Sequence, residues 1–125
     1  MNKYRNQEVV TFDGIKHASR KEADRWCELK LLERSGKISE LKRQVKFTLI
    51  PAQYEVYERY SKSGKRLKDG QRCIEKACEY IADFVYRNAQ SNEIVVEDTK
   101  GFRTEKYIIK RKLMLYIHHI RIREV

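Results

Sequence analysis

The run "IVVEDTKG", residues 94–101, has the composition of a short strand that ends on charged side chains. Residues two apart on an extended strand project to the same face, so Asp98 and Lys100 lie together and Glu97 and Thr99 face the other way. A carboxylate beside an ammonium group can bind a divalent cation and a phosphate. The D-x-K tripeptide is frequent by chance, so the case for a site depends on further carboxylates.

One further carboxylate interrupts "YIADFVY", a segment that is otherwise apolar and aromatic. An aspartate inside a strand disfavours the strand, and it costs free energy if it is buried without a partner. The strand period of two puts Ile81 and Val85 on the face of Asp83, which argues against a fully wet face. Asp83 therefore needs a compensating charge or ligand.

Another carboxylate falls on the apolar side of a predicted helix. Glu22 precedes Trp26 by four residues and Leu29 by seven, so all three share one arc of the helix. Glu22 also lies three residues after Ser19, where it could complete a capping box. Both roles, site carboxylate and capping residue, are consistent with the sequence.

Carboxylates at Glu22, Asp83 and Asp98 that converge would repel one another unless a hard cation neutralised them. Mg²⁺, or Mn²⁺ in its place, takes oxygen ligands and keeps some of its waters, one of which it can activate for attack on a phosphate. Lys100 could position or deprotonate the attacking water, or neutralise charge in the transition state. These residues together predict phosphodiester hydrolysis.

Two helices and four strands are expected to position these residues. "SRKEADRWCELKLLERSGKI" predicts a helix over residues 19–35, with a natural stop at Gly36. "VKFTLIPAQ" predicts a strand that ends at Pro51, and "CEYIADFVYR" and "EIVVED" predict two more strands joined as a hairpin by "NAQSN". A helix over "TEKYIIKRKLMLY", capped by Thr104, and a last strand in "IRIREV" complete the order helix, three strands, helix, strand.

The expected architecture is an α/β domain spanning residues 1–125, with a mixed central sheet flanked by helices. Residues 54–72 interrupt it, because they are polar, rich in tyrosine and contain the turn-forming stretch "KSGKRLKDG". We expect an excursion from the sheet here, either a hairpin or a loop.

The net charge of +10 over 125 residues favours a polyanionic partner, since each Lys or Arg that reaches a phosphate releases a counterion. Nucleic acid is the first candidate. The opening "MNKYRNQEVV" has no apolar leader, and no run approaches the roughly 20 apolar residues of a membrane span. The sequence predicts a cytoplasmic protein that does not act at a membrane.

Basic residues are concentrated at two places. Residues 101–125 hold seven cations and two carboxylates, which is a net +5. The second place is "YSKSGKRLK", which could contact phosphate and which carries tyrosines able to stack on a base, to pack on the sheet or to meet a second subunit. The candidate nucleic-acid-binding residues are Arg103, Lys106, Lys110, Arg111, Lys65 and Arg66.

With these blocks in this order, the chain resembles the PD-(D/E)xK nuclease superfamily. More closely, "SRKEADRWCELKLLERSGKI", "FTLIPAQ", "YIADFVY" and "VVEDTKGFRTEKYIIKRKLMLY" resemble a family of small phage and prophage proteins of that superfamily. The resemblance runs from about residue 14 to the C-terminus. It implies a restriction-endonuclease-like αβββαβ core, which small Holliday-junction resolvases share.

The resemblance also implies roles for individual residues. Asp83, Asp98 and Glu22 would be metal ligands, and Lys100 would be the catalytic lysine. The chain departs from the family motif in having alanine before Asp83 where the motif has proline. It also doubles the second acid, and we expect Asp98 to be the ligand and Glu97 to stand behind it or to face the opposite side.

The leading hypothesis is a Mg²⁺- or Mn²⁺-dependent endonuclease that cuts branched or duplex DNA in phage recombination or replication. Cutting a four-way junction needs two symmetric incisions, so that substrate would imply a homodimer. One alternative is a DNA-binding accessory protein with a vestigial site, although none of Glu22, Asp83, Asp98 and Lys100 has been lost. A third hypothesis is a basic structural protein that binds RNA or an acidic partner and needs no metal.

Overall fold

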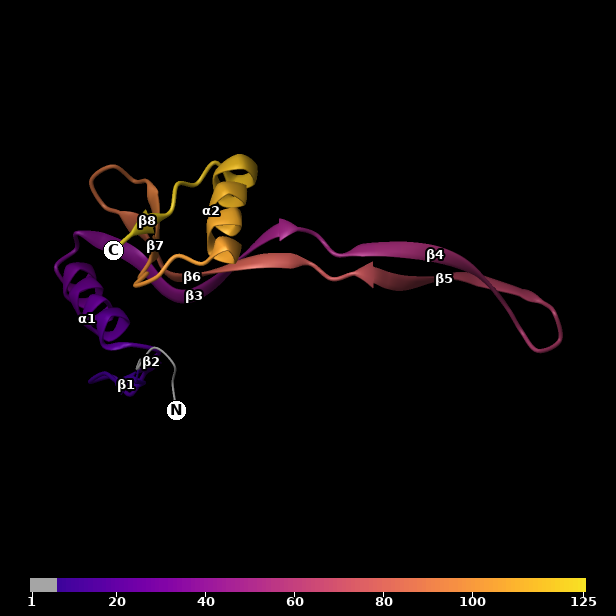
Figure 1. The fold of residues 1–125 in the computed structure, drawn as a ribbon, viewed down its shortest axis with the longest axis horizontal. Coiled ribbons are helices and arrows are strands. Elements are labelled where there is room, and N and C mark those ends of the chain that lie inside the picture. The colour runs from indigo at the N-terminus through magenta and orange to yellow at the C-terminus, as the bar shows by residue number, and fades with distance from the viewer. Residues whose placement is uncertain (1–6) are drawn as a thin grey trace.

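The computed structural model describes residues 7–125, which fold into two helices and eight strands (Figure 1). In chain order the elements are β1 (Val9–Val10), β2 (Lys16–His17), α1 (Arg20–Arg34), β3 (Ile38–Ile50), β4 (Gln53–Tyr60), β5 (Arg66–Glu75), β6 (Cys78–Asn88), β7 (Ile94–Asp98), α2 (Glu105–His118) and β8 (Arg123–Glu124).

The central sheet has the strand order β3-β6-β7-β8. Its first three strands are antiparallel, and β8 pairs with β7 in parallel, so the sheet is mixed. The prediction of an α/β fold with a mixed sheet and flanking helices is confirmed at that level. Apart from the β1–β2 and β4–β5 hairpins, the chain order is α1, β3, β6, β7, α2, β8.

Two predicted strand boundaries were wrong. Strand β3 begins at Ile38, well before the predicted start at Val45. The sequence pattern missed residues 38–44 because they are mostly polar, and their backbone is irregular, with left-handed conformations at Glu40 and Gln44. The last strand is only Arg123–Glu124, because these are the two residues that pair with β7. Ile122, just before them, is buried in the core.

Both helices begin where the sequence predicts. The Ser19 hydroxyl accepts a hydrogen bond from the Glu22 N–H at 3.2 Å, and the Thr104 hydroxyl accepts one from the Tyr107 N–H at 3.1 Å. These contacts satisfy amide groups that the first helical turn leaves unpaired. Helix α1 ends at Arg34, and Gly36, just beyond the C-cap residue Ser35, has a φ of +80°, which suits a residue without a Cβ.

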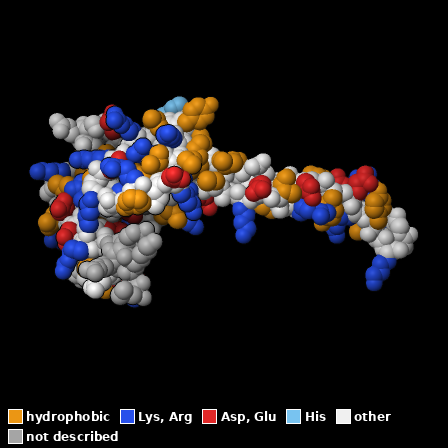
Figure 2. All heavy atoms as spheres, viewed as in Figure 1, with side chains coloured by type: hydrophobic (Ala, Val, Ile, Leu, Met, Phe, Trp, Pro, Cys, Tyr) orange, Lys and Arg blue, Asp and Glu red, His pale blue; other side chains and the backbone are white. Residues whose placement is uncertain are grey.

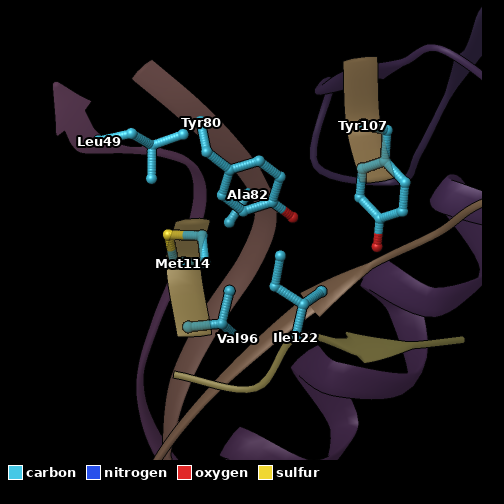
Figure 3. Close-up of a cluster of buried hydrophobic side chains, with 7 residues drawn as sticks. All are labelled: Leu49, Tyr80, Ala82, Val96, Tyr107, Met114 and Ile122. Atoms are coloured by element: carbon cyan, nitrogen blue, oxygen red, sulfur yellow. The ribbon is translucent and has the colours of Figure 1, made fainter. Parts of the chain in front are cut away.

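The helices cover opposite faces of the sheet. Val95 and Val96 are neighbours on β7 and so point to opposite faces. Val95 packs against the cluster that holds Trp26 and Leu29 of α1. Val96 belongs to the second cluster, which includes Met114 of α2 and is drawn in Figure 3. Each helix therefore buries its apolar side against its own face of the sheet.

The predicted excursion is an extended hairpin. Strands β4 and β5 pair antiparallel from Gln53–Glu75 to Tyr60–Arg66 and project from the body as a long ribbon (Figure 1). The hairpin is longer than the predicted residues 54–72, and every residue of β4 is exposed. We call residues 53–75 the arm.

Within residues 7–125, neither helix is long and apolar enough to cross a membrane.

Candidate functional site

Asp83 and Asp98 come from neighbouring strands. Asp83 lies in the middle of β6, where its Oδ2 accepts hydrogen bonds from the Thr99 amide at 2.9 Å and the Thr99 hydroxyl at 2.8 Å. Asp98 is the last residue of β7 and is 1% exposed. The Tyr80 hydroxyl donates to Asp98 Oδ2. The aspartate inside the apolar strand is thus fixed to the end of β7, as its need for a partner required.

Lys100 stands beside Asp98, as the spacing predicted. Its Nζ is 3.3 Å from Asp98 Oδ1 and 4.6 Å from the centre of the Tyr107 ring. The side chain is about one third exposed, so its ammonium group reaches solvent while the carboxylate does not. The Lys21 ammonium group also contacts the Lys100 carbonyl at 3.4 Å, which ties α1 to the segment after β7.

Glu22 brings a third carboxylate from α1. It is 5% exposed, and its Oε1 accepts a hydrogen bond from Gln44 Nε2 at 3.3 Å. His17 Nδ1 lies 3.7 Å from the same oxygen. The Glu22 N–H donates to the Ser19 hydroxyl, but the Glu22 carboxylate accepts from Gln44 and, in residues 7–125, not from the Ser19 N–H, so only half of the predicted capping box forms.

The three carboxylates interact electrostatically. Burial raises the pKa of Glu22, and the charges of Asp83 and Asp98 raise it further, although Arg43 acts in the opposite direction. Burial also raises the pKa of Asp98 to about 6, with a further contribution from Asp83, while Tyr80 and Lys100 lower it. Both shifts arise because ionised carboxylates are poorly solvated here and repel one another.

The donor set fits a hard divalent cation. Mg²⁺ and Mn²⁺ favour oxygen ligands, and a cation would relieve the repulsion among these carboxylates. Asp98 Oδ1 is buried and accepts no hydrogen bond, and Lys100 Nζ is its charged neighbour. In residues 7–125, no three His, Cys, Asp or Glu side chains stand close enough to form a complete metal cage. A cation would therefore need side-chain adjustment or water ligands.

Glu97 faces the opposite side of the sheet from Asp98. It is fully buried, and its carboxylate accepts hydrogen bonds from Arg25 Nε at 2.8 Å and Arg25 Nη2 at 2.7 Å. The Tyr86 hydroxyl donates to it as well. The Glu97 side chain thus lies on the face of the sheet that α1 covers, and its carboxylate accepts three hydrogen bonds there.

A basic pocket opens next to the site. It has a volume of about 250 Å³ and is lined by Tyr80, Ile81, Lys100, Thr104, Lys106, Tyr107 and Lys110. Lys106 and Lys110 lie one helical turn apart on α2. Together with Lys100 they contribute three lysines to the lining of the pocket.

The other candidate nucleic-acid-binding residues are not part of this pocket. Arg103 and Arg111 share Glu124, at 2.8 Å and 3.6 Å, so part of their charge is already compensated. Lys65 and Arg66 lie near the tip of the arm, away from the body (Figure 1). Arg66 pairs with Asp69 at 2.8 Å and with Glu58 at 3.8 Å.

Four residues around the site were missed in the sequence: His17, Arg43, Gln44 and Tyr80. The buried His17 packs on Trp26, and burial together with Arg43 lowers its pKa. Gln44, which has a left-handed backbone, donates to Glu22. The tyrosine immediately flanking "IADF" could have been considered as a donor to a buried carboxylate, but the others carry no comparable pattern.

The fold and the site define a mixed α/β protein with a buried carboxylate cluster, a lysine and a basic pocket on one side. The chain belongs to the family described as "Protein of unknown function (DUF1064)", whose model matches residues 1–124. No curated protein and no solved structure matches the chain.

Proposed function

We propose that this protein is a metal-dependent DNA endonuclease. The observation that carries the proposal is the contact of Lys100 with the buried Asp98 at 3.3 Å, beside Asp83 and Glu22, which lie near enough that the charge of Asp83 adds to burial in raising the pKa of both Glu22 and Asp98. Carboxylates held together at such a cost indicate a function that needs them.

The element order supports the finer assignment. With the β1–β2 and β4–β5 hairpins left out, the order α1, β3, β6, β7, α2, β8 is compatible with the αβββαβ order that the PD-(D/E)xK resemblance implies, with Asp83 on β6, Asp98 at the end of β7 and Lys100 two residues beyond it. We propose that Glu22, Asp83 and Asp98 hold Mg²⁺ or Mn²⁺. Glu97 is better explained as the partner of Arg25 than as a ligand.

Each residue then has a distinct role. A bound divalent cation supplies a Lewis acid for the phosphate and lowers the pKa of a water molecule. The Lys100 ammonium group stabilises negative charge at the phosphate, which it can reach because it is partly exposed. Tyr80 and Thr99 hold the two aspartates by hydrogen bonds, and Lys106 and Lys110 attract the DNA backbone to the adjacent pocket.

The proposed setting is the cytoplasm of a bacterial cell, on phage or prophage DNA during recombination or replication. If the substrate is a four-way junction, two sites must act together, and the working form is a homodimer.

Cleavage of labelled four-way junction, flap, single-stranded and linear duplex DNA with Mg²⁺ or Mn²⁺ tests the proposal. The wild type should cut, Asp83→Asn should not, and Lys100→Ala should cut at least about 10² more slowly. The substrate that is cut fastest identifies the preferred DNA structure.

A DNA-binding accessory protein is the second candidate, because residues 7–125 contain no complete three-residue metal cage. This candidate predicts tight DNA binding with no cleavage under any divalent cation. That outcome would replace the endonuclease proposal.

A further inference from the structure

Among residues 7–125, nothing packs against either face of the arm. All eight residues of β4 are exposed, and in β5 only Gly70 is partly covered. A two-stranded hairpin with neither face covered is at best marginally stable in water. The exposed strands of the arm are thus available to a partner outside the chain.

Cross-strand side-chain contacts nevertheless hold the two strands of the arm together. The Tyr57 ring lies over Gly70, its cross-strand neighbour, so closely that a Cβ added to Gly70 would be 2.5 Å from the ring carbon Cζ. The Arg72 guanidinium group lies 4.2 Å from the centre of the same ring and also pairs with Glu55 at 3.0 Å. These cross-strand contacts stiffen the shaft of the arm.

Charge is distributed unevenly along the arm. Along the shaft, cations and carboxylates pair with each other, as Arg72 does with Glu55. The distal residues 59–68 hold five cations and no carboxylate. Of these, Arg59, Lys62, Lys65 and Lys68 form no ion pair with any carboxylate in residues 7–125. Lys and Arg side chains are visible at the far end of the arm in Figure 2.

The tip is also a defined turn. The Ser61 N–H donates to the Lys65 carbonyl at 2.8 Å, and the Lys65 N–H donates to the Ser61 hydroxyl at 3.0 Å. Gly64 has a φ of +86°, which the turn requires and which favours glycine. The lysines on either side of Gly64 are therefore presented together at the end of a closed hairpin.

We propose that the arm binds the phosphate backbone of duplex DNA at a distance from the candidate site, through the lysines of its tip. A two-stranded ribbon fits the width of a DNA major groove, and a cluster of unpaired cations complements phosphate. This inference rests on the proposed function for the DNA at the site, and it adds a second, remote contact.

The length of the arm sets the scale of that contact. Lys65, in the tip turn, lies 18 residues before Asp83, which is at most roughly 60 Å of extended chain. With one phosphate per ~3.4 Å of each strand, the tip would contact DNA up to about 18 base pairs from the site. A shorter duplex bound at the site would not reach the tip.

Binding of labelled duplexes of about 12 and about 30 base pairs, measured by fluorescence anisotropy in EDTA, tests this proposal. The variant Lys62→Gln/Lys65→Gln/Lys68→Gln should bind the long duplex at least about tenfold more weakly, with a salt slope lower by about 2 to 3. Its affinity for the short duplex should stay within about twofold of the wild type.

Two controls accompany the test. Lys16→Gln/Arg34→Gln/Lys37→Gln removes the same charge from exposed positions on the body and should change neither affinity by more than about twofold. Lys62→Arg/Lys65→Arg/Lys68→Arg keeps the charge and should bind like the wild type. Equal losses for both duplexes, or no loss for either, would overturn the proposal.

The outcome separates this proposal from the endonuclease proposal. Cleavage with unchanged length dependence in the glutamine variant would overturn the role of the arm and leave the endonuclease standing. Length-dependent binding through the tip without any cleavage would support the role of the arm and overturn the endonuclease proposal. If the wild type is a dimer and the glutamine variant a monomer, the arm is a protein interface, and the DNA proposal fails.

Discussion

Gln44 lies between Arg43 and Val45, whose pairing with Phe84 and Ala82 of β6 sets it across from Asp83, and its backbone has a left-handed φ of +53°. A residue other than glycine in this conformation costs about 1 kcal/mol or more, and such strain is concentrated at functional sites. Here the irregular backbone accompanies a hydrogen bond from the Gln44 side-chain amide to Glu22 at 3.3 Å. The strain thus coincides with a contact to a site carboxylate.

Two substitutions of Gln44 separate strain from positioning. Gln44→Gly removes the strain and the amide together, so unfolding in denaturant should show stability unchanged or higher by about 1 kcal/mol, while DNA cleavage falls about tenfold. Gln44→Ala keeps the strained backbone and should lose the same activity without the gain in stability. Wild-type cleavage by both variants would rule out a positioning role.

Lys100 should matter for the reaction and little for binding. Lys100→Ala removes the ammonium group beside Asp98 and should lower the cleavage rate by about 10² or more, with DNA affinity within a few-fold of the wild type. Lys112→Ala, an exposed lysine on α2, is the matched control and should cleave normally. Single-turnover cleavage and anisotropy make the comparison. Equal losses in both variants would indicate a general electrostatic effect.

The buried, ionised carboxylate of Asp98 should reduce the stability of the metal-free protein. Because its pKa is about 6 in the fold and 3.8 in the unfolded chain, ionising it in the fold costs about 3 kcal/mol at neutral pH. Asp98→Asn removes this cost but weakens the contacts with Tyr80 and Lys100, so we expect a net gain of about 1 to 2 kcal/mol without divalent cation.

The same variant tests the metal. Mg²⁺ or Mn²⁺ should raise the melting temperature of the wild type and leave that of Asp98→Asn nearly unchanged, because a ligand that binds only the folded state stabilises it. Differential scanning fluorimetry with and without cation measures both effects. A wild type that no divalent cation stabilises would contradict the proposed metal site.

The contacts of Asp83 and Asp98 could be predicted from the sequence more fully than some of the strand boundaries could. Asp83 could be identified because a charge inside an apolar strand needs a partner, and the chain supplies one from Thr99. Asp98 and Lys100 could be placed together because strand geometry fixes which residues share a face. Such inferences need only local geometry and the cost of burying charge.

Other features depend on contacts that the sequence does not reveal. Gln44 is a polar residue in a polar stretch, and only the pairing of β3 with β6 shows that it faces Asp83. The arm was expected only as an excursion, because a hairpin exposed on both faces has no alternation of buried and exposed residues. The start of β3 was missed because residues 38–44 are mostly polar and their backbone is irregular at Glu40 and Gln44.

Glu97 should contribute to the stability of the fold and not to metal binding. Arg25→Met leaves its buried carboxylate without the bidentate partner, so stability should fall by about 3 kcal/mol or more. Glu28→Gln breaks only the exposed pair with Arg25 and should cost less than about 1 kcal/mol. Urea unfolding compares the two. If Glu97→Gln abolishes stabilisation by Mg²⁺, then Glu97 is a ligand and this assignment is wrong.

Asp13 should make the fold sensitive to strong acid. Although burial raises the pKa of this carboxyl, hydrogen bonds from the Thr11 hydroxyl, the Trp26 indole and the Ile15 amide outweigh it and lower the pKa to about 2. The unfolded chain protonates Asp13 near pH 3.8, before the folded protein does. The contribution to stability is therefore complete above about pH 4 and is lost as the pH falls towards 2.

The effect is modest, because Asp13 is exposed to solvent, which screens the interaction to about 1 kcal/mol or less. Melting temperatures at pH 5, 3 and 2 should converge for the wild type and Asp13→Asn as the pH falls, because protonation removes what the substitution has already removed. Asp24→Asn, an exposed aspartate on α1, serves as the control. A gap between wild type and Asp13→Asn that stays constant from pH 5 to pH 2 would show that the Trp26 contact does not depend on the charge.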